Sequence, residues 1–126
     1  MPYAPTVAIV DDDEAIREAL GDLLMVSGFA CYKFADAASF LAARKTHPFD
    51  CLVTDIRMPG MNGIALIEHL REESAELPVI VLSSVLDEQT RARALVLGAC
   101  AWLTKPATDE RLLGAIAAAI GDSTTP

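Results

Sequence analysis

Five short apolar segments alternate along the chain with five amphipathic segments, and this alternation constrains the fold more than any other feature. The apolar segments have the length of strands and lie at residues 7–10, 30–34, 49–54, 79–82 and 101–104. Strands that are apolar along their whole length are typical of a parallel sheet, because helices then bury both of its faces. The sequence therefore predicts an α/β fold with a doubly wound, five-stranded parallel sheet and five helices.

Capping residues and glycines mark the ends of the predicted helices. An N-cap is expected at Asp36, at Asp87, and at Thr108 or Asp109. A glycine that ends a helix is expected at Gly28, Gly98 and Gly121. The third helix is predicted over residues 64–73, with Ile64, Ile67 and Leu70 facing the core. With 126 residues, the chain is expected to form one domain over residues 1–121, and residues 122–126 an unstructured tail or the start of a linker.

Three acidic residues directly follow two of the predicted strands. Asp11 and Asp12 come after the first strand, and Asp55 comes after the third. In an open α/β sheet the ligand crevice lies at the carboxyl ends of the strands, and these acids share it only if the two strands are neighbours. The strand order 2-1-3-4-5 meets this condition. Carboxylates that meet in one crevice repel one another unless a hard cation joins them, so the sequence predicts a Mg²⁺ site beside a phosphorylatable aspartate.

Composition excludes several other classes of protein. The formal net charge is −8, and the chain has no basic stripe, which argues against direct nucleic-acid binding by this domain. No stretch approaches the length of a membrane span or has the pattern of a signal peptide. Cys31, Cys51 and Cys100 are odd in number and far apart, so we expect small buried thiols and no disulfide. A soluble, cytoplasmic protein is expected.

Two longer motifs carry a resemblance to a known family. They are VDDDE at residues 10–14 and VTDIRMPGMNG at residues 53–63, which occur here together with Ser83 and the pair Lys105-Pro106. In these residues the chain resembles the receiver domain of bacterial two-component response regulators, the CheY-like or flavodoxin-like fold, over residues 7–120. The segment around Asp55 is most similar to the FixJ type, whose receivers usually precede a DNA-binding domain that this chain does not include. The chain is thus expected to be either part of a transcription regulator or a single-domain regulator.

The resemblance implies a role for each residue of the crevice. Asp55 would accept a phosphoryl group from a histidine kinase, in a switch with self-catalysed phosphotransfer and autodephosphorylation. The Mg²⁺ ligands would be Asp11, Asp12, Asp55 and the backbone carbonyl of Arg57. Lys105 would pair with Asp55 at rest and with a phosphoryl oxygen afterwards, and the peptide bond to Pro106 would be cis.

The resemblance also implies how phosphorylation reaches the surface. Ser83 matches the hydroxyl that moves toward the phosphate, and Trp102 stands where the family usually has the Tyr or Phe that turns inward. Arg91, Arg93 and Val96 are candidate contacts with a partner, on a surface where such domains bind their output or form a homodimer on phosphorylation.

Two other functions compete with this interpretation. A receiver can act through protein contacts that do not depend on phosphorylation, and the larger indole of Trp102 leaves that alternative open. A Mg²⁺-dependent phosphohydrolase of the haloacid-dehalogenase type also uses an aspartate nucleophile. That class would require a second aspartate at the position of Arg57.

Overall fold

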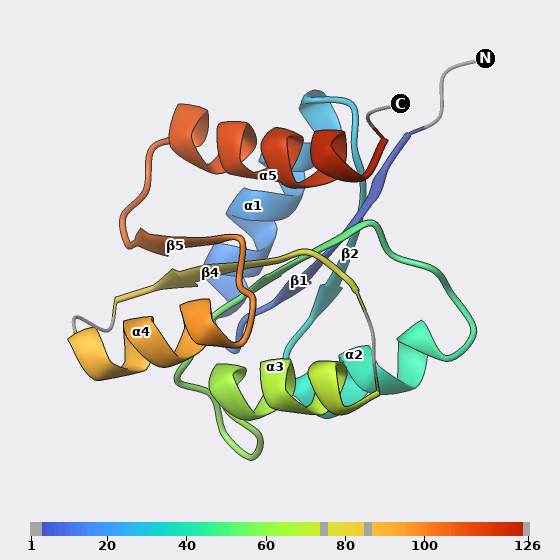
Figure 1. Ribbon diagram of the computed structural model, residues 1–126. Helices are drawn as coiled ribbons and strands as arrows, with labels where there is room; N and C mark the ends of the chain where they lie inside the picture. The colour runs from blue at the N-terminus through green and yellow to red at the C-terminus, as the bar shows by residue number, and fades with distance from the viewer. Residues whose placement is uncertain (1–3, 74–75, 85–86, 125–126) are drawn as a thin grey trace.

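The five apolar segments form a single parallel sheet. The computed structural model describes residues 4–73, 76–84 and 87–124. Its strands are β1 (Thr6–Val10), β2 (Ala30–Phe34), β3 (Cys51–Thr54), β4 (Val79–Ser83) and β5 (Ala101–Thr104). They are ordered β2-β1-β3-β4-β5, as Figure 1 shows, so the predicted fold and strand order are confirmed. β3 begins later than predicted, at Cys51, where its pairing with Val7 starts.

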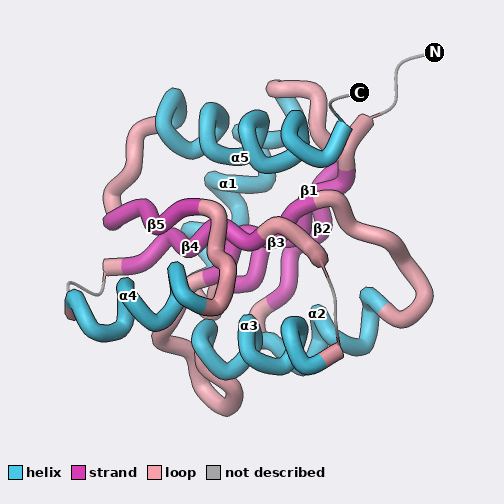
Figure 2. The backbone as a smooth tube through the Cα atoms, in the orientation of Figure 1, coloured by secondary structure: helices cyan, strands magenta, loops and turns pink. Residues whose placement is uncertain are grey.

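Helices cover both faces of this sheet. They are α1 (Glu14–Val26), α2 (Ala37–Arg44), α3 (Gly63–Glu72), α4 (Glu88–Val96) and α5 (Asp109–Thr124). Helices α1 and α5 lie on one face, and α2, α3 and α4 lie on the other (Figure 2). Each face has its own apolar cluster, with Leu24 and Ile116 buried on the first and Phe40 and Leu66 on the second. None of the helices within the described ranges is long and apolar enough to cross a bilayer.

Most of the predicted helix ends are observed. The side chains of Asp36 and Asp87 accept hydrogen bonds from backbone N–H groups of the first turns of α2 and α4. Thr108 caps α5, since its Oγ1 accepts from the N–H of Arg111 at 3.1 Å. Gly28 and Gly98 have a φ of 93°, the left-handed conformation that glycine adopts without steric cost. These residues therefore end α1 and α4 as the sequence indicated.

The prediction that Gly121 ends the last helix is wrong. Helix α5 continues through Gly121 to Thr124, so residues 122–124, predicted as part of an unstructured tail, are helical. Residues 125 and 126 lie outside the described residues. A single glycine costs a helix only about 1 kcal/mol relative to alanine, and the preceding alanine-rich turns favour the helix. Gly121 therefore does not stop α5.

The core face of α3 is rotated from the predicted one. Ile67 and Leu70 are fully buried as expected, but Leu66 is buried as well, while Ile64 is only partly covered. α3 begins at Gly63, with Asn62 as its N-cap, and its first turn lies against the loop that follows β3. The buried stripe of α3 therefore lies along Gly63, Leu66, Ile67 and Leu70.

The three cysteines are free thiols in different environments. Cys51 is fully buried in the cluster beneath α1 and α5, and Cys31 is half-buried. Cys100 is exposed, so the expectation that all three are buried is wrong for this residue. Burial raises the pKa of Cys51 to about 12 and, to a lesser extent, raises that of Cys31.

These environments predict the order in which the thiols react with a modifying reagent. At a pH near 8 only about 10⁻⁴ of a thiol with the pKa of Cys51 is thiolate, and the side chain is inaccessible as well. Iodoacetamide should label Cys100 first, Cys31 more slowly, and Cys51 only after denaturation, as peptide mass mapping over time would show. Labelling of Cys51 at the rate of Cys100 in the native protein would contradict its placement in the core.

Candidate functional site

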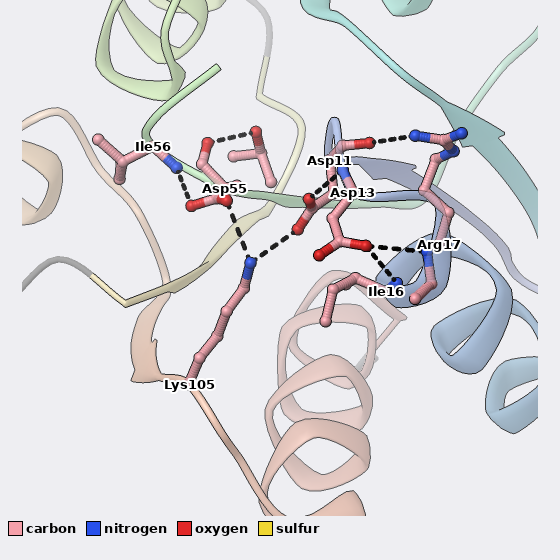
Figure 3. A network of polar contacts seen from close by, with 9 residues as sticks. Asp11, Asp13, Ile16, Arg17, Asp55, Ile56 and Lys105 are labelled. Carbon is pink, nitrogen blue, oxygen red and sulfur yellow. Dashed lines mark hydrogen bonds and ion pairs between the residues drawn. The ribbon is translucent and has the colours of Figure 1, made fainter.

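The acidic residues of two strands meet at the carboxyl edge of the sheet. β1 and β3 are paired neighbours, with Val10 opposite Thr54, and this pairing brings the residues after each strand together. One carboxylate oxygen from each of Asp11, Asp12 and Asp55 lies within 4.8 Å of the others. Figure 3 shows Asp11 and Asp55 turned toward the same space, with Lys105 between them. The geometry therefore brings together all three acids that the sequence singled out.

Lys105 bridges two of these acids. Its Nζ lies 3.0 Å from Oδ2 of Asp11 and 3.1 Å from Oδ2 of Asp55. Lys105 follows β5, and its backbone N–H donates to the carbonyl oxygen of Ser83 at 2.9 Å, which anchors it to the end of β4. Burial lowers the pKa of Lys105, but its hydrogen bonds to Asp11 and Asp55 and their negative charges outweigh burial and hold the pKa above its ordinary value. The ammonium therefore neutralises part of the acidic crevice.

Asp55 is held by its own neighbours in the chain. Its Oδ1 accepts a hydrogen bond from the backbone N–H of Ile56 at 2.6 Å, and its backbone carbonyl accepts one from the hydroxyl of Thr54 at 2.9 Å. Only 11% of the side chain is exposed. The first turn of α3 lies against this segment, because the N–H of Gly63 donates to the carbonyl of Ile56 at 2.8 Å. Asp55 is therefore fixed in direction but reachable through the crevice.

Gly63 supports the site through close backbone packing, which no sequence pattern indicated. A Cβ at this residue would lie 2.2 Å from the backbone oxygen of Asp55 and 3.0 Å from the Cα of Ile56. Only glycine fits at this distance, since real Cβ atoms do not approach an oxygen so closely. The absence of a side chain at Gly63 lets α3 begin directly beside Asp55.

The loop between β1 and α1 is held by hydrogen bonds between side chains and the backbone. Oδ1 of Asp11 accepts from the N–H of Asp13 at 2.9 Å, and Asp13 caps α1 by accepting from Ala15 and Ile16. The guanidinium of Arg17 donates to the backbone carbonyl of Asp11 at 2.9 Å, as Figure 3 shows. Arg17 did not stand out in the sequence because its importance depends on where the loop folds back onto α1. Asp13 is accounted for by helix capping.

The oxygen atoms of this crevice suit a hard divalent cation. Mg²⁺ prefers carboxylate, carbonyl and water oxygens and is commonly bound by only a few carboxylates. Asp12 is exposed, and among the described residues its carboxylate makes no hydrogen bond or ion pair, so it is available as a ligand. Arg57 lies two residues after Asp55 with an exposed side chain. The residues present therefore fit a Mg²⁺ ion, and the role of the Arg57 carbonyl stays a prediction.

The residues expected to transmit the signal lie on strands next to the crevice. Ser83 is fully buried at the end of β4. Trp102 is paired with Val81 and is partly buried against the cluster beneath α2, α3 and α4. Because side chains alternate along a strand, Ser83, Val81 and Trp102 point to the same face of the sheet. The Lys105-Pro106 peptide bond is cis, in agreement with the sequence-based expectation.

The candidate partner contacts differ in their exposure and in their ion pairs with neighbouring residues. Val96 is 79% exposed. Arg91 is also exposed and lies 3.6 Å from the carboxylate of Glu88 one turn earlier. Arg93 forms an ion pair with Glu68 of α3, so it contributes to packing between helices. Contact of these residues with a partner stays a prediction.

Known proteins are similar to this chain in sequence and in fold. Residues 7–117 match the family described as response regulator receiver domain. The transcriptional regulatory protein FixJ of Azorhizobium caulinodans is 39% identical over 98% of this chain and 58% of its own length. The response regulator protein TodT of Pseudomonas putida is 37% identical over 93% of this chain and 52% of its own length. The chain thus spans little more than half the length of these curated relatives.

Solved structures agree with these sequence relatives. The crystal structure of FixJ-N superposes with a TM-score of 0.87 at 34% identity and covers 94% of this chain and 95% of its own. The chemotaxis response regulator CheY4 of Vibrio cholerae superposes with a TM-score of 0.85 at 27% identity and covers 93% of this chain and 99% of its own. The predicted resemblance to the FixJ type is therefore confirmed.

Proposed function

The chain belongs to the response-regulator receiver domain family, and on that premise we propose that it is phosphorylated on Asp55 by a histidine kinase in the presence of Mg²⁺. The observation that carries this proposal is the meeting of Asp11, Asp12 and Asp55 at one point, with Lys105 bound to two of them. This combination supplies a nucleophile, oxygen ligands for a cation and a fixed positive charge. The relative from Azorhizobium caulinodans is a transcriptional regulatory protein, which favours regulation of transcription as the output.

The phosphotransfer step follows from the groups around Asp55. A carboxylate oxygen of Asp55 attacks the phosphorus of the donor and forms an acyl phosphate, while the bond from phosphorus to the donor nitrogen or oxygen breaks. The backbone N–H of Ile56 holds the other carboxylate oxygen and thereby orients the nucleophile. Lys105, already bound to Asp55, stays beside the new phosphoryl group and pairs with one of its oxygens. A bound Mg²⁺ would neutralise charge that develops on the phosphoryl oxygens during transfer.

Release of the phosphoryl group completes the proposed switch. Water attacks the phosphorus and the acyl phosphate bond breaks, which restores the carboxylate of Asp55 and yields inorganic phosphate. Both steps use the domain's own residues, so the protein is a self-catalysed switch and not a metabolic enzyme. The family match and the arginine at position 57 count against the phosphohydrolase alternative.

The signal is proposed to pass through the face that carries Ser83 and Trp102. A phosphoryl group adds about −1.5 to −2 charge and three hydrogen-bond acceptors, enough to draw the hydroxyl of Ser83 toward Asp55. Trp102 lies on the same face and would move into space that Ser83 vacates. The surface of α4 with Arg91, Arg93 and Val96 would then bind an output partner or a second copy of the chain.

Intact mass measurement after incubation with acetyl phosphate tests the proposal. We expect one added phosphoryl group in the presence of Mg²⁺ and none when Mg²⁺ is removed with a chelator. A receiver that works only with its kinase would show no adduct but would bind beryllofluoride, which mimics the phosphoryl group. Absence of both the adduct and beryllofluoride binding would contradict the proposal and favour output that does not depend on phosphorylation.

Replacing Asp12 tests the metal site separately from the nucleophile. Asp12→Ala removes a carboxylate that has no other task among the described residues, so the fold should be unaffected. We expect the Mg²⁺ concentration needed for half-maximal labelling by acetyl phosphate to rise at least about tenfold. Asp22→Ala, an exposed acid on α1 outside the cluster, is the control and should behave as wild type. An unchanged Mg²⁺ requirement in Asp12→Ala would remove Asp12 from the ligand set.

A further inference from the structure

We infer that Arg17 is a positioning residue that holds the loop carrying Asp11 and Asp12 in the shape that binds Mg²⁺. The inference rests on the proposed function, because it concerns the metal site of that reaction. Arg17 lies on α1, outside the three acids and the lysine that form the crevice. It acts through the backbone of the loop and touches none of the reacting atoms.

Arg17 contacts the loop at two points on either side of Asp12. Its guanidinium Nη1 donates to the carbonyl oxygen of Asp11 at 2.9 Å. Its backbone N–H donates to the carbonyl oxygen of Asp13 at 3.0 Å, as the first turn of α1 requires. The bond from the guanidinium is the stronger kind, because the donor carries a charge. One residue therefore ties the carbonyl groups of Asp11 and Asp13, on either side of Asp12, to the same helix.

Asp12 depends on this restraint more than the other two acids do. Asp11 and Asp55 are each held by Lys105, whereas the carboxylate of Asp12 has no hydrogen bond or ion pair among the described residues. The position of Asp12 is thus set by the backbone of the loop alone. Mg²⁺ demands nearly ideal octahedral geometry, so a small shift of this backbone should weaken binding.

The charge of Arg17 and its hydrogen bond to Asp11 have opposite effects on the affinity for Mg²⁺. A positive guanidinium near a cation site repels Mg²⁺, so removing the charge alone should strengthen binding. Loss of the hydrogen bond to Asp11 should weaken it. The sign of the change in Mg²⁺ affinity therefore separates a positioning residue from a residue that only balances the charge of the acids.

The experiment compares the Mg²⁺ affinity of four proteins by titration calorimetry with magnesium chloride. Arg17→Met keeps the length of the side chain but removes both the donor and the charge, and its affinity should fall at least about tenfold. Arg17→Lys keeps the charge and can donate with poorer geometry, so its affinity should lie between those of wild type and Arg17→Met. Arg111→Met removes an exposed arginine from the first turn of α5 and should bind Mg²⁺ as well as wild type or slightly better.

A second readout distinguishes positioning from general damage to the fold. In the acetyl phosphate reaction, Arg17→Met should need more Mg²⁺ for half-maximal labelling but reach the wild-type extent of labelling at saturating Mg²⁺. A damaged fold would lower the extent at every Mg²⁺ concentration, and that result would overturn the inference.

The outcomes separate this inference from the proposed function. Unchanged or tighter Mg²⁺ binding by Arg17→Met would overturn the positioning role while leaving the proposed function intact. If Arg17→Met does not fold, Arg17→Lys decides, because wild-type affinity in that variant would equally overturn the role. A wild-type protein that does not bind Mg²⁺ would overturn the metal site of the proposed function itself.

Discussion

Replacement of Asp55 by asparagine should abolish phosphorylation by acetyl phosphate and leave the fold intact. The amide of asparagine is not nucleophilic, so labelling should fall at least about a thousandfold, as expected when an enzyme loses its nucleophile. Asparagine has the size of aspartate, and its Oδ1 can still accept the hydrogen bond from the N–H of Ile56. Intact mass spectrometry of Asp55→Asn beside wild type gives the result directly.

Asp50→Asn is the matched control for this prediction. Asp50 precedes β3, whereas Asp55 follows it, so the two acids lie at opposite ends of this strand. The side chain of Asp50 accepts from the backbone N–H of Thr6 at 2.8 Å, a contact that an asparagine oxygen can also make. We expect normal labelling in Asp50→Asn. Labelling that survives in Asp55→Asn would place the phosphoryl group on another residue.

Asp55→Asn should not destabilise the protein. In wild type, the carboxylates of Asp11, Asp12 and Asp55 meet within 4.8 Å, and Lys105 is the only cationic side chain that forms an ion pair with these carboxylates among the described residues. Removing one charge relieves repulsion at the cost of weakening one ion pair. Thermal unfolding without Mg²⁺ should therefore show a midpoint equal to or above that of wild type. A large drop would mean that the ion pair between Lys105 and Asp55 outweighs the repulsion.

Substitution of Gly63 by alanine should be the most damaging change of a residue that carries no functional group. The added methyl group would lie 2.2 Å from the backbone oxygen of Asp55, and neither backbone segment can move freely, since the N–H of Gly63 is bonded to the carbonyl of Ile56. We expect a loss of about 3 kcal/mol in the free energy of unfolding, the upper end of the range for overpacking. This corresponds to a fall of about 10 °C in the midpoint of thermal unfolding. Phosphorylation should also slow, because Asp55 is displaced.

Gly114→Ala provides the control within the same chain. Gly114 is exposed on α5, and a Cβ at this position has no atom within 4 Å. Alanine is the better helix former, so this variant should gain about 0.5–1 kcal/mol in stability. Opposite shifts of the two variants in thermal or urea unfolding would identify close packing at Gly63 as the cause. Equal shifts would show that α3 moves away from Asp55 without cost.

The strand pattern and most of the helix ends could be predicted because they depend on local chemistry. A strand such as Val79–Ser83 is apolar on both faces, and Asp36 and Asp87 cap helices through bonds to residues only two or three positions away. The helix that continues past Gly121 and the rotated core face of α3 could not be predicted in this way. Both depend on a balance of small energies, in which alanine-rich turns and contacts with the sheet outweigh a local preference.

The candidate site could be predicted in part for a similar reason. Carboxylates that directly follow buried strands point to the carboxyl edge of a parallel sheet, so Asp11, Asp12 and Asp55 were found from their positions alone. The second bond of Lys105, to Asp11, was not predicted, because the resemblance implied only the pairing of Lys105 with Asp55. Arg17 and Gly63 were missed because each contacts backbone atoms of another segment, and no sequence motif indicates such a contact.

The fold class and the acids of the crevice could be read from short segments, because hydrophobic periodicity and residues at strand ends are local properties. The strand order was predicted because it lets those acids share one crevice. The contacts that hold those acids in place depend on the three-dimensional packing. It brought Lys105 between Asp11 and Asp55, placed the guanidinium of Arg17 on the carbonyl of Asp11, and allowed α3 to begin against Asp55. Each of these contacts requires distances of about 3 Å or less between separate segments. Such distances are set by how the helices pack on the sheet.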